Sequence, residues 1–188
     1  MDKKSENLIF FLLAIFSIYC SLIIGMSWDE PYLYELGKNR LKYLFSLGIY
    51  KYQNPIYFAN ASYFPGFYDT LTAFISQMIP KNYETQIHHI INLFFSISAV
   101  IGISKISKIL FNKKVSKIVF LIIFLNPIFF GHMSINPKDT IIAFSNVWAT
   151  YFIIRYLQTQ QISAKRKHFS TLVGLTIGFG IGVRVIFI

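Results

Sequence analysis

The feature that most constrains this chain is a series of long apolar runs separated by shorter polar segments. The first run, from Leu8 to Met26, contains no charged residue. At about 1.5 Å per residue, a helix of this length crosses the roughly 30 Å hydrocarbon core of a bilayer. Further runs lie near residues 85–104, 118–137, 140–157 and 169–188. We therefore expect an all-α, polytopic integral membrane protein with about five transmembrane helices.

The composition agrees with this class and argues against an ordinary soluble domain. Of the 188 residues, 54% are hydrophobic and 14% are charged, whereas a soluble domain has about 25% charged residues. A secretory signal peptide would have a shorter apolar core and a small-residue cleavage site. Residues 8–26 are instead followed by Trp28 and two acids, so we expect them to remain as an anchor.

The net charge of +10 could indicate a nucleic-acid partner, but the positions of the basic residues favour membrane orientation. The segments "KISKILFNKKVSK" and "RYLQTQQISAKRKH" are basic and contain no acid. If the N-terminus is cytoplasmic, alternating spans place both segments in the cytoplasm, as the positive-inside rule requires. We expect no nucleic-acid partner. The expected location is a bacterial inner membrane with a periplasmic first loop, or the endoplasmic reticulum membrane in a eukaryote.

The longest segment that does not span, residues 27–84, is expected at the outer face. Its "PYLYELGKNRLKYLFSLG" places apolar residues on one helical face and polar residues on the other. The apolar face is Leu33, Leu36, Leu41, Leu44 and Phe45, and the polar face is Glu35, Lys38, Asn39, Lys42 and Ser46. This pattern predicts an amphipathic helix in the membrane interface. The later "TLTAFISQMIP" is too short to span and predicts a second interfacial or re-entrant helix.

The last apolar run, residues 169–188, carries two further expectations. Gly174, Gly178 and Gly182 recur at four-residue spacing, which predicts close packing against a neighbouring helix. The run stops at "GVRVIFI" without interfacial anchors. We therefore treat residues 1–188 as a single N-terminal membrane module that is truncated at its C-terminus.

Polar residues from several segments are expected in one layer near the outer face. They are Asp29, Glu30, His88, His89, His132, Asn136, Lys138, Asp139 and Arg184. An ionisable residue inside a span is costly and marks a candidate functional site. Arg184, expected in the outer half of the last span, can bind a lipid phosphate through its planar guanidinium. Alternatively, it extends to the surface or pairs with an acid of the same protein.

The acidic residues have both structural and chemical interpretations. Asp29 and Glu30 can form a solvated helix end before Pro31, or act as bases, because a carboxylate near an apolar surface can have a raised pKa. Asp139 lies in "NPKD", which is typical of a helix N-terminus with Asp at or near the cap position. Lys138 can be an interfacial anchor or a phosphate ligand.

The histidines give a weaker signal. His88 and His89 are adjacent, so on a helix they lie about 100° apart and cannot share one metal ion as an i, i+4 pair would. His132 together with a nearby carboxylate can bind a divalent cation. The sequence requires no cofactor, and a divalent cation is compatible with it.

The order of these elements resembles the GT-C glycosyltransferases. The strings that carry the resemblance are "SWDEPYLY" after the first span, "YFPGFYDTL" late in the outer loop, "HHIINLFFSI", and "LNPIFFGHMSINPKDTIIAF" at the fourth span. They are most similar to dolichyl-phosphate-mannose protein mannosyltransferases and to bacterial relatives that use polyprenyl-phosphate sugars. The resemblance covers nearly the whole chain, and "GHMSINPKD" is its most distinctive string.

The resemblance implies transfer of one sugar, with inversion, from a lipid phosphate to a hydroxyl of a protein or glycolipid at the outer face. Asp29 matches the catalytic acid of the first outer loop, Glu30 is its neighbour, and Asp139 matches a second acidic position. The other candidates, for contacts to the donor phosphate or to the donor and acceptor, are Arg184, Lys138, His88, His89 and His132.

Other classes of protein remain open at this stage. In a non-enzymatic membrane protein, such as a transporter fragment or an assembly subunit, the acids and Arg184 would form structural pairs or line an ion path. An inactive, truncated glycosyltransferase is a further alternative. An acyltransferase or phosphotransferase would require a nucleophile motif, and the sequence has none.

Overall fold

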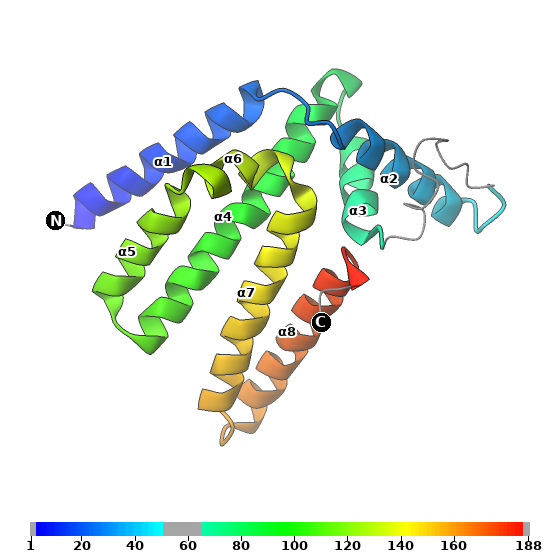
Figure 1. The fold of residues 1–188 in the computed structure, drawn as a ribbon. Helices are drawn as coiled ribbons and strands as arrows, with labels where there is room; N and C mark the ends of the chain where they lie inside the picture. The colour runs from blue at the N-terminus through cyan, green and yellow to red at the C-terminus, as the bar shows by residue number, and fades with distance from the viewer. Residues whose placement is uncertain (1–2, 51–64, 186–188) are drawn as a thin grey trace.

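The structure is a computed structural model that describes residues 3–50 and 65–185, and all of its regular elements are helical (Figure 1). The predicted all-α class is confirmed. The elements are α1 (Lys3–Ile23), α2 (Glu30–Phe45), α3 (Phe67–Ser76), the 3₁₀ turn η2 (Lys81–Tyr83), α4 (Glu84–Leu110), α5 (Lys113–Phe124), α6 (Pro127–Ile135), α7 (Pro137–Gln158) and α8 (Ser163–Ile181).

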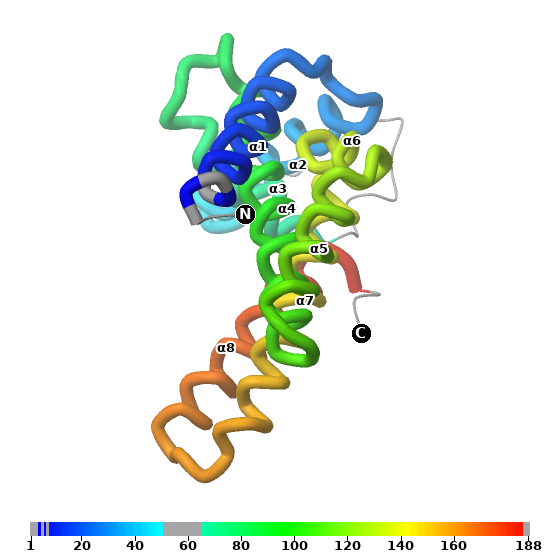
Figure 2. Tube along the Cα trace, turned by 90° about the vertical axis from the view of Figure 1, so that its left-hand side faces the viewer, coloured from blue at the N-terminus to red at the C-terminus, as the bar shows by residue number. Residues whose placement is uncertain are grey.

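Helix α4 is the centre of the fold. It packs against α1, α5, α6 and α7, and α8 in turn packs against α7. The turns between α4 and α5 and between α7 and α8 both lie toward the lower end of the molecule (Figures 1 and 2). Helices α2 and α3 pack on each other at the opposite end. The two segments that are rich in basic residues are therefore far from the α2–α3 pair.

Asparagine caps set the boundaries of three helices. The side chain of Asn112 accepts hydrogen bonds from two amides at the start of α5. Asn126 caps α6 and Asn136 caps α7, each directly before a proline. Proline suits the first turn of a helix because its missing N–H would have no partner there. Asp139 lies in the first turn of α7, near the cap, but the cap residue itself is Asn136.

The Asn126–Pro127 pair explains why the expected third span is not one helix. Residues 118–137 were expected to cross as a unit, but α5 and α6 meet at an angle of 68°. Pro127 cannot continue a helix that begins before it, because it lacks an amide proton and disfavours the helical backbone conformation at the preceding residue. In the described residues, Lys81–Leu110 is the one helix that is long and apolar enough to cross a membrane. Helices α5 and α6 are long and apolar enough to cross a membrane only when the two are counted as one bent span.

Helix α1 has polar residues inside and apolar residues outside. Ser17 and Ser21 are each 1% exposed, whereas Phe11 is 61% and Tyr19 58% exposed. A helix on the surface of a soluble protein has the opposite arrangement, with its apolar face toward the core. Buried serines and an apolar exterior are typical of helices that pack together in lipid.

Helix α2 agrees in part with the predicted amphipathic helix. Leu33, Leu36 and Leu41 are buried as expected, whereas Leu44 is 60% and Phe45 69% exposed. Asn39 was assigned to the polar face but is 8% exposed, and its side-chain oxygen accepts a hydrogen bond from the Tyr50 hydroxyl at 3.3 Å. At Gly37 the helices approach closely, because a Cβ there would lie 2.3 Å from the Asp69 carbonyl oxygen.

The end of the last helix differs from the expectation in two ways. Helix α8 ends at Ile181, so Arg184 lies after the helix and not within the span expected at 169–188. The carbonyl of Gly182 accepts a hydrogen bond from the Phe67 amide at 3.0 Å, which holds this segment against α3. The expected close packing is wrong for Gly174 and Gly178, since a Cβ at either position would have no atom within 4 Å.

We expect Gly102→Ala to destabilise the crossing of α4 and α7. A Cβ at Gly102 would lie 2.5 Å from Cγ1 of Val147, and overpacking of this kind costs about 1–3 kcal/mol. Val147→Ala should restore part of the loss. Gly174→Ala is the matched control, because it should be neutral or stabilise α8 by up to about 1 kcal/mol. The stabilities of the wild type, Gly102→Ala, Gly102→Ala with Val147→Ala, and Gly174→Ala are compared by thermal unfolding in detergent. Equal stability of the two single glycine variants would contradict the prediction.

Candidate functional site

The adjacent acids Asp29 and Glu30 occupy opposite environments. Asp29 is the residue before α2 and is exposed, whereas Glu30 is 2% exposed. Although Asp29 has the N-cap position, its carboxylate accepts no hydrogen bond from the amides of α2. Among the described residues, no side chain pairs with this carboxylate. Asp29 is therefore compatible with a solvated helix end that makes no side-chain cap, whereas Glu30 is buried and is not solvated.

The carboxylate of Glu30 has three close partners. One oxygen lies 2.8 Å from Nε2 of His89 and accepts a hydrogen bond from the Tyr34 hydroxyl at 3.1 Å. The other accepts a hydrogen bond from the Ser27 amide. Nδ1 of His89 is 3.1 Å from the Ser21 carbonyl oxygen. Because a carbonyl only accepts, Nδ1 carries the proton in this contact.

These contacts keep Glu30 ionised. Burial raises the pKa of this carboxyl, but hydrogen bonds from His89, Ser27 and Tyr34 outweigh burial and hold the pKa below its usual value of 4.5. Burial and the neighbouring Glu30 raise the pKa of the Tyr34 hydroxyl well above its usual value. Tyr34 therefore remains a hydrogen-bond donor to a charged acceptor.

Two cavities meet at the start of α7, the larger of about 590 Å³ and the smaller of about 310 Å³. The residues that line both are Leu33, Pro137, Lys138, Asp139 and Arg184. The smaller cavity is also lined by Asp29, His132 and Asn136. Apolar side chains such as Leu36, Ile142 and Val183 add to the wall of the larger cavity. The two cavities together have a polar side near Asp29 and an apolar side between α2, α7 and the C-terminal segment.

Arg184 pairs with Asp139 where the cavities meet. A guanidinium nitrogen lies 3.3 Å from an Asp139 carboxylate oxygen, and the two side chains are 46% and 62% exposed. The other Asp139 oxygen accepts a hydrogen bond from Asn136 at 3.0 Å. Pairing with an acid of the same chain was one of the two alternatives for Arg184. An exposed pair contributes at most about 1 kcal/mol, so a ligand anion can compete for the guanidinium.

Buried polar contacts hold the α6–α7 corner in place. The Asn92 side chain on α4 donates to the Met133 carbonyl at 3.1 Å and accepts from the Thr140 hydroxyl at 2.9 Å. The Ser96 hydroxyl also donates to the Met133 carbonyl, at 2.9 Å. Asn92 and Ser96 are at most 1% exposed, and buried hydrogen bonds of this kind rigidify a site. Helix α4 therefore positions the residues at the start of α7.

The larger cavity contains an ion pair that the sequence did not reveal. A guanidinium nitrogen of Arg40 on α2 lies 3.0 Å from an Asp69 carboxylate oxygen on α3, and both side chains are largely buried. Burial raises the pKa of Asp69, while the nearby Arg40 and Lys138 oppose this shift. The pair depends on the close approach of α2 and α3 at Gly37, which no local motif indicates.

The structure brings together some of the predicted site residues and separates others. Those that line the smaller cavity are Asp29, His132, Lys138, Asp139 and Arg184. Glu30, His88 and His89 lie elsewhere. The His88 ring stacks on Tyr34 at a centroid distance of 3.8 Å. With Glu30 it lines a small cavity of about 10 Å³ that shares Leu33, Tyr68, Asp69 and Pro137 with the larger cavity. In the part of the chain that the structure describes, no cluster of His, Cys, Asp or Glu is arranged to hold a metal ion.

Comparisons with protein-family models, with curated proteins and with solved structures found no match to this chain. The site is therefore interpreted from its own geometry.

Proposed function

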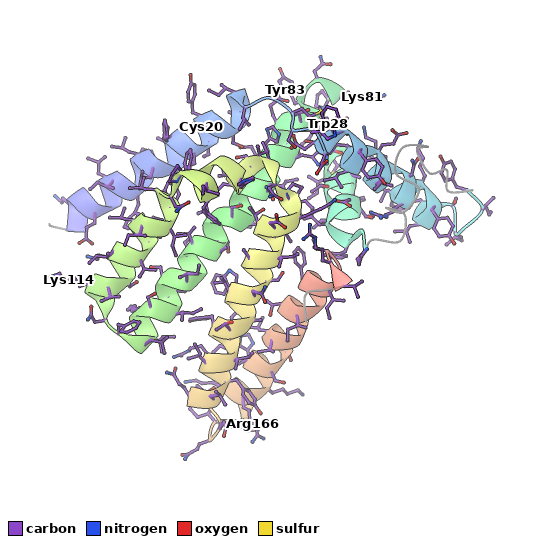
Figure 3. All side chains as sticks on the ribbon, in the orientation of Figure 1. Cys20, Trp28, Lys81, Tyr83, Lys114 and Arg166 are labelled. Carbon is purple, nitrogen blue, oxygen red and sulfur yellow. The ribbon has the colours of Figure 1, made fainter. Side chains whose placement is uncertain are left out.

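We propose that the chain is a multi-pass membrane protein in which α1, α4, the α5–α6 pair, α7 and α8 cross the bilayer. The apolar exterior of α1 supports this arrangement. Figure 3 shows Lys114 and Arg166 at the end of the molecule opposite Trp28, Lys81 and Tyr83. Basic residues favour the cytoplasmic side, and Trp and Tyr favour the interface, so the α2–α3 pair faces outward.

We further propose that the protein is a glycosyltransferase that moves a sugar from a lipid phosphate to an acceptor hydroxyl. One observation carries this proposal: the carboxylate of Asp29, which has no side-chain partner among the described residues, lines the same cavity as the cationic Arg184 and Lys138. Such a site can accept a proton on one side and hold a phosphate on the other. The apolar wall of the adjoining cavity offers a surface for the lipid chain.

In the proposed reaction, Asp29 accepts the proton of the acceptor hydroxyl as its oxygen attacks the anomeric carbon. The bond between this carbon and the phosphate oxygen breaks, and the lipid phosphate leaves with the electron pair. Arg184 and Lys138 stabilise the negative charge that develops on the phosphate. A single displacement of this kind inverts the configuration at the anomeric carbon.

The Arg184–Asp139 pair also fits a non-enzymatic membrane protein, in which such pairs are structural. The two functions differ in what they require of Asp29. A catalytic base needs a carboxylate that can accept a proton, whereas a structural role does not.

The full chain in nanodiscs, supplied with radiolabelled polyprenyl-phosphate sugars and candidate peptide or glycolipid acceptors, tests the proposal. We expect labelled acceptor and free lipid phosphate in equal amounts. No labelled product with any donor would contradict the enzymatic function. For orientation, cysteines introduced at Lys114 and Arg166 in a Cys20→Ser background should react from one side of the membrane, and one at Lys81 from the other.

A further inference from the structure

The turn that carries Asp29 is held by backbone hydrogen bonds and by the side chain of Glu30. The Glu30 amide donates to the Ser27 carbonyl at 3.3 Å, and the Ser27 amide donates to the Glu30 carboxylate. The Asp29 carbonyl accepts a hydrogen bond from the Leu33 amide at 3.1 Å. These bonds fix the backbone before and after Asp29, so the direction of its exposed side chain depends on Glu30.

Glu30 is in turn fixed by the helix bundle. His89 on α4 is fully buried, and its ring connects the Ser21 carbonyl at the end of α1 to the Glu30 carboxylate. Ser27 is also tied to the end of α6, since its hydroxyl lies 3.4 Å from the Ile135 carbonyl oxygen. The turn is therefore anchored to α1, α4 and α6, next to the cavity that Asp29 lines.

We propose that Glu30 is a positioning residue, which holds the turn so that Asp29 points into the cavity, and that it exchanges no proton with the substrate. Its burial closes it to a substrate, and all of its near partners are donors from this chain. The role of Asp29 as the base rests on the proposed function, but the anchoring of the turn does not.

Activity of three variants separates positioning from proton transfer. Glu30→Ala removes the contacts of the Glu30 side chain to the Ser27 amide, Tyr34 and His89, and should lower kcat about 100-fold, as small misplacements of catalytic groups do. Glu30→Gln can still accept from the Ser27 amide and donate to Nε2 of His89, so kcat should stay within about threefold of the wild type. Asp29→Asn should not retain activity. Equal loss in Glu30→Gln and Asp29→Asn would overturn the proposal, and Glu35→Gln on the exposed face of α2 is the control.

Fluorescence provides a test that does not depend on activity. The chain has two tryptophans. Trp28 lies in the turn, and Trp148 on α7 donates to the Ser98 hydroxyl at 3.0 Å. In a Trp148→Phe background, Glu30→Ala should lower the anisotropy of Trp28 and Glu30→Gln should leave it unchanged. In a Trp28→Phe background, the anisotropy of Trp148 should not change in either variant.

The outcomes of the two tests are distinguishable. Unchanged Trp28 anisotropy in Glu30→Ala overturns the positioning role. The expected anisotropy pattern in a protein that transfers no sugar contradicts the proposed function and still supports the anchoring of the turn. If Glu30→Ala also changes the anisotropy of Trp148, the variant Glu30→Asp is used in place of Glu30→Ala. Its shorter side chain cannot reach both His89 and the Ser27 amide, and it should lower the anisotropy of Trp28 alone.

Discussion

Asp29→Asn is expected to reduce kcat for sugar transfer by about 10²–10⁴-fold, which is the contribution of a positioned general base. Asparagine has nearly the same shape as aspartate but cannot accept the acceptor's proton. Because the Asp29 carboxylate has no partner among the described residues, its loss should leave the turn, the helix and the Glu30 network intact. The affinity for the lipid-phosphate donor should therefore stay close to that of the wild type.

The measurement is a comparison of initial rates and of donor KM for the wild type, Asp29→Asn and Glu35→Gln. Glu35 is an exposed acid on the same helix, so its variant controls for the loss of one negative charge near the site. Full activity in Asp29→Asn would remove Asp29 from the reaction. The base would then have to be another acid of the cavity, with Asp139 the first to test.

Arg184→Gln is expected to raise the donor KM by roughly 10–100-fold. Hydrogen bonds to charged groups contribute about 1.5–3 kcal/mol each, and a guanidinium can form two in parallel with one phosphate. Arg184→Lys keeps the charge without the planar fork, so it should recover part of the loss. Arg166→Gln removes an arginine at the opposite end of the molecule (Figure 3) and should not change the donor KM.

Binding of the donor to nanodiscs, measured with a non-transferable analogue, separates this effect from a change in chemistry. Asp139→Asn provides a second comparison, because it releases Arg184 from its partner within the chain. If Arg184 binds the phosphate, this variant should bind the donor no more weakly than the wild type does. Unchanged donor affinity in Arg184→Gln would instead indicate that the pair with Asp139 is structural.

The sequence predicts the helices well where hydrophobic periodicity is long and uninterrupted. Helices α4 and α7 lie where the apolar runs at 85–104 and 140–157 placed them, and α2 follows its amphipathic pattern in part. The break at Asn126 was visible as an Asn-Pro pair, but the surrounding hydropathy favoured a continuous span. Hydropathy averages over a window, whereas a cap and a proline act at single positions, so the two signals disagreed at this point.

The site was less accessible to prediction because its contacts join distant parts of the chain. Depth in the membrane indicated that Asp29, Asp139 and Arg184 share a layer, and the structure places all three at one cavity. The same argument could not separate Asp29 from Glu30, since adjacent residues have the same depth. Their difference depends on His89, which reaches only one of them, and this follows from the packing of α2 against α4.

The candidate site draws on both ends of the described sequence, since Asp29 precedes α2 and Arg184 follows α8. During synthesis, N-terminal elements are made and can fold first, so the carboxylate is in place well before the guanidinium. The bond between the Gly182 carbonyl and the Phe67 amide can form only after α8 has been made. A nascent chain therefore lacks this combination of groups until α8 and Arg184 have been made. The proposed phosphate site therefore cannot form on a chain that has been synthesised only as far as α7.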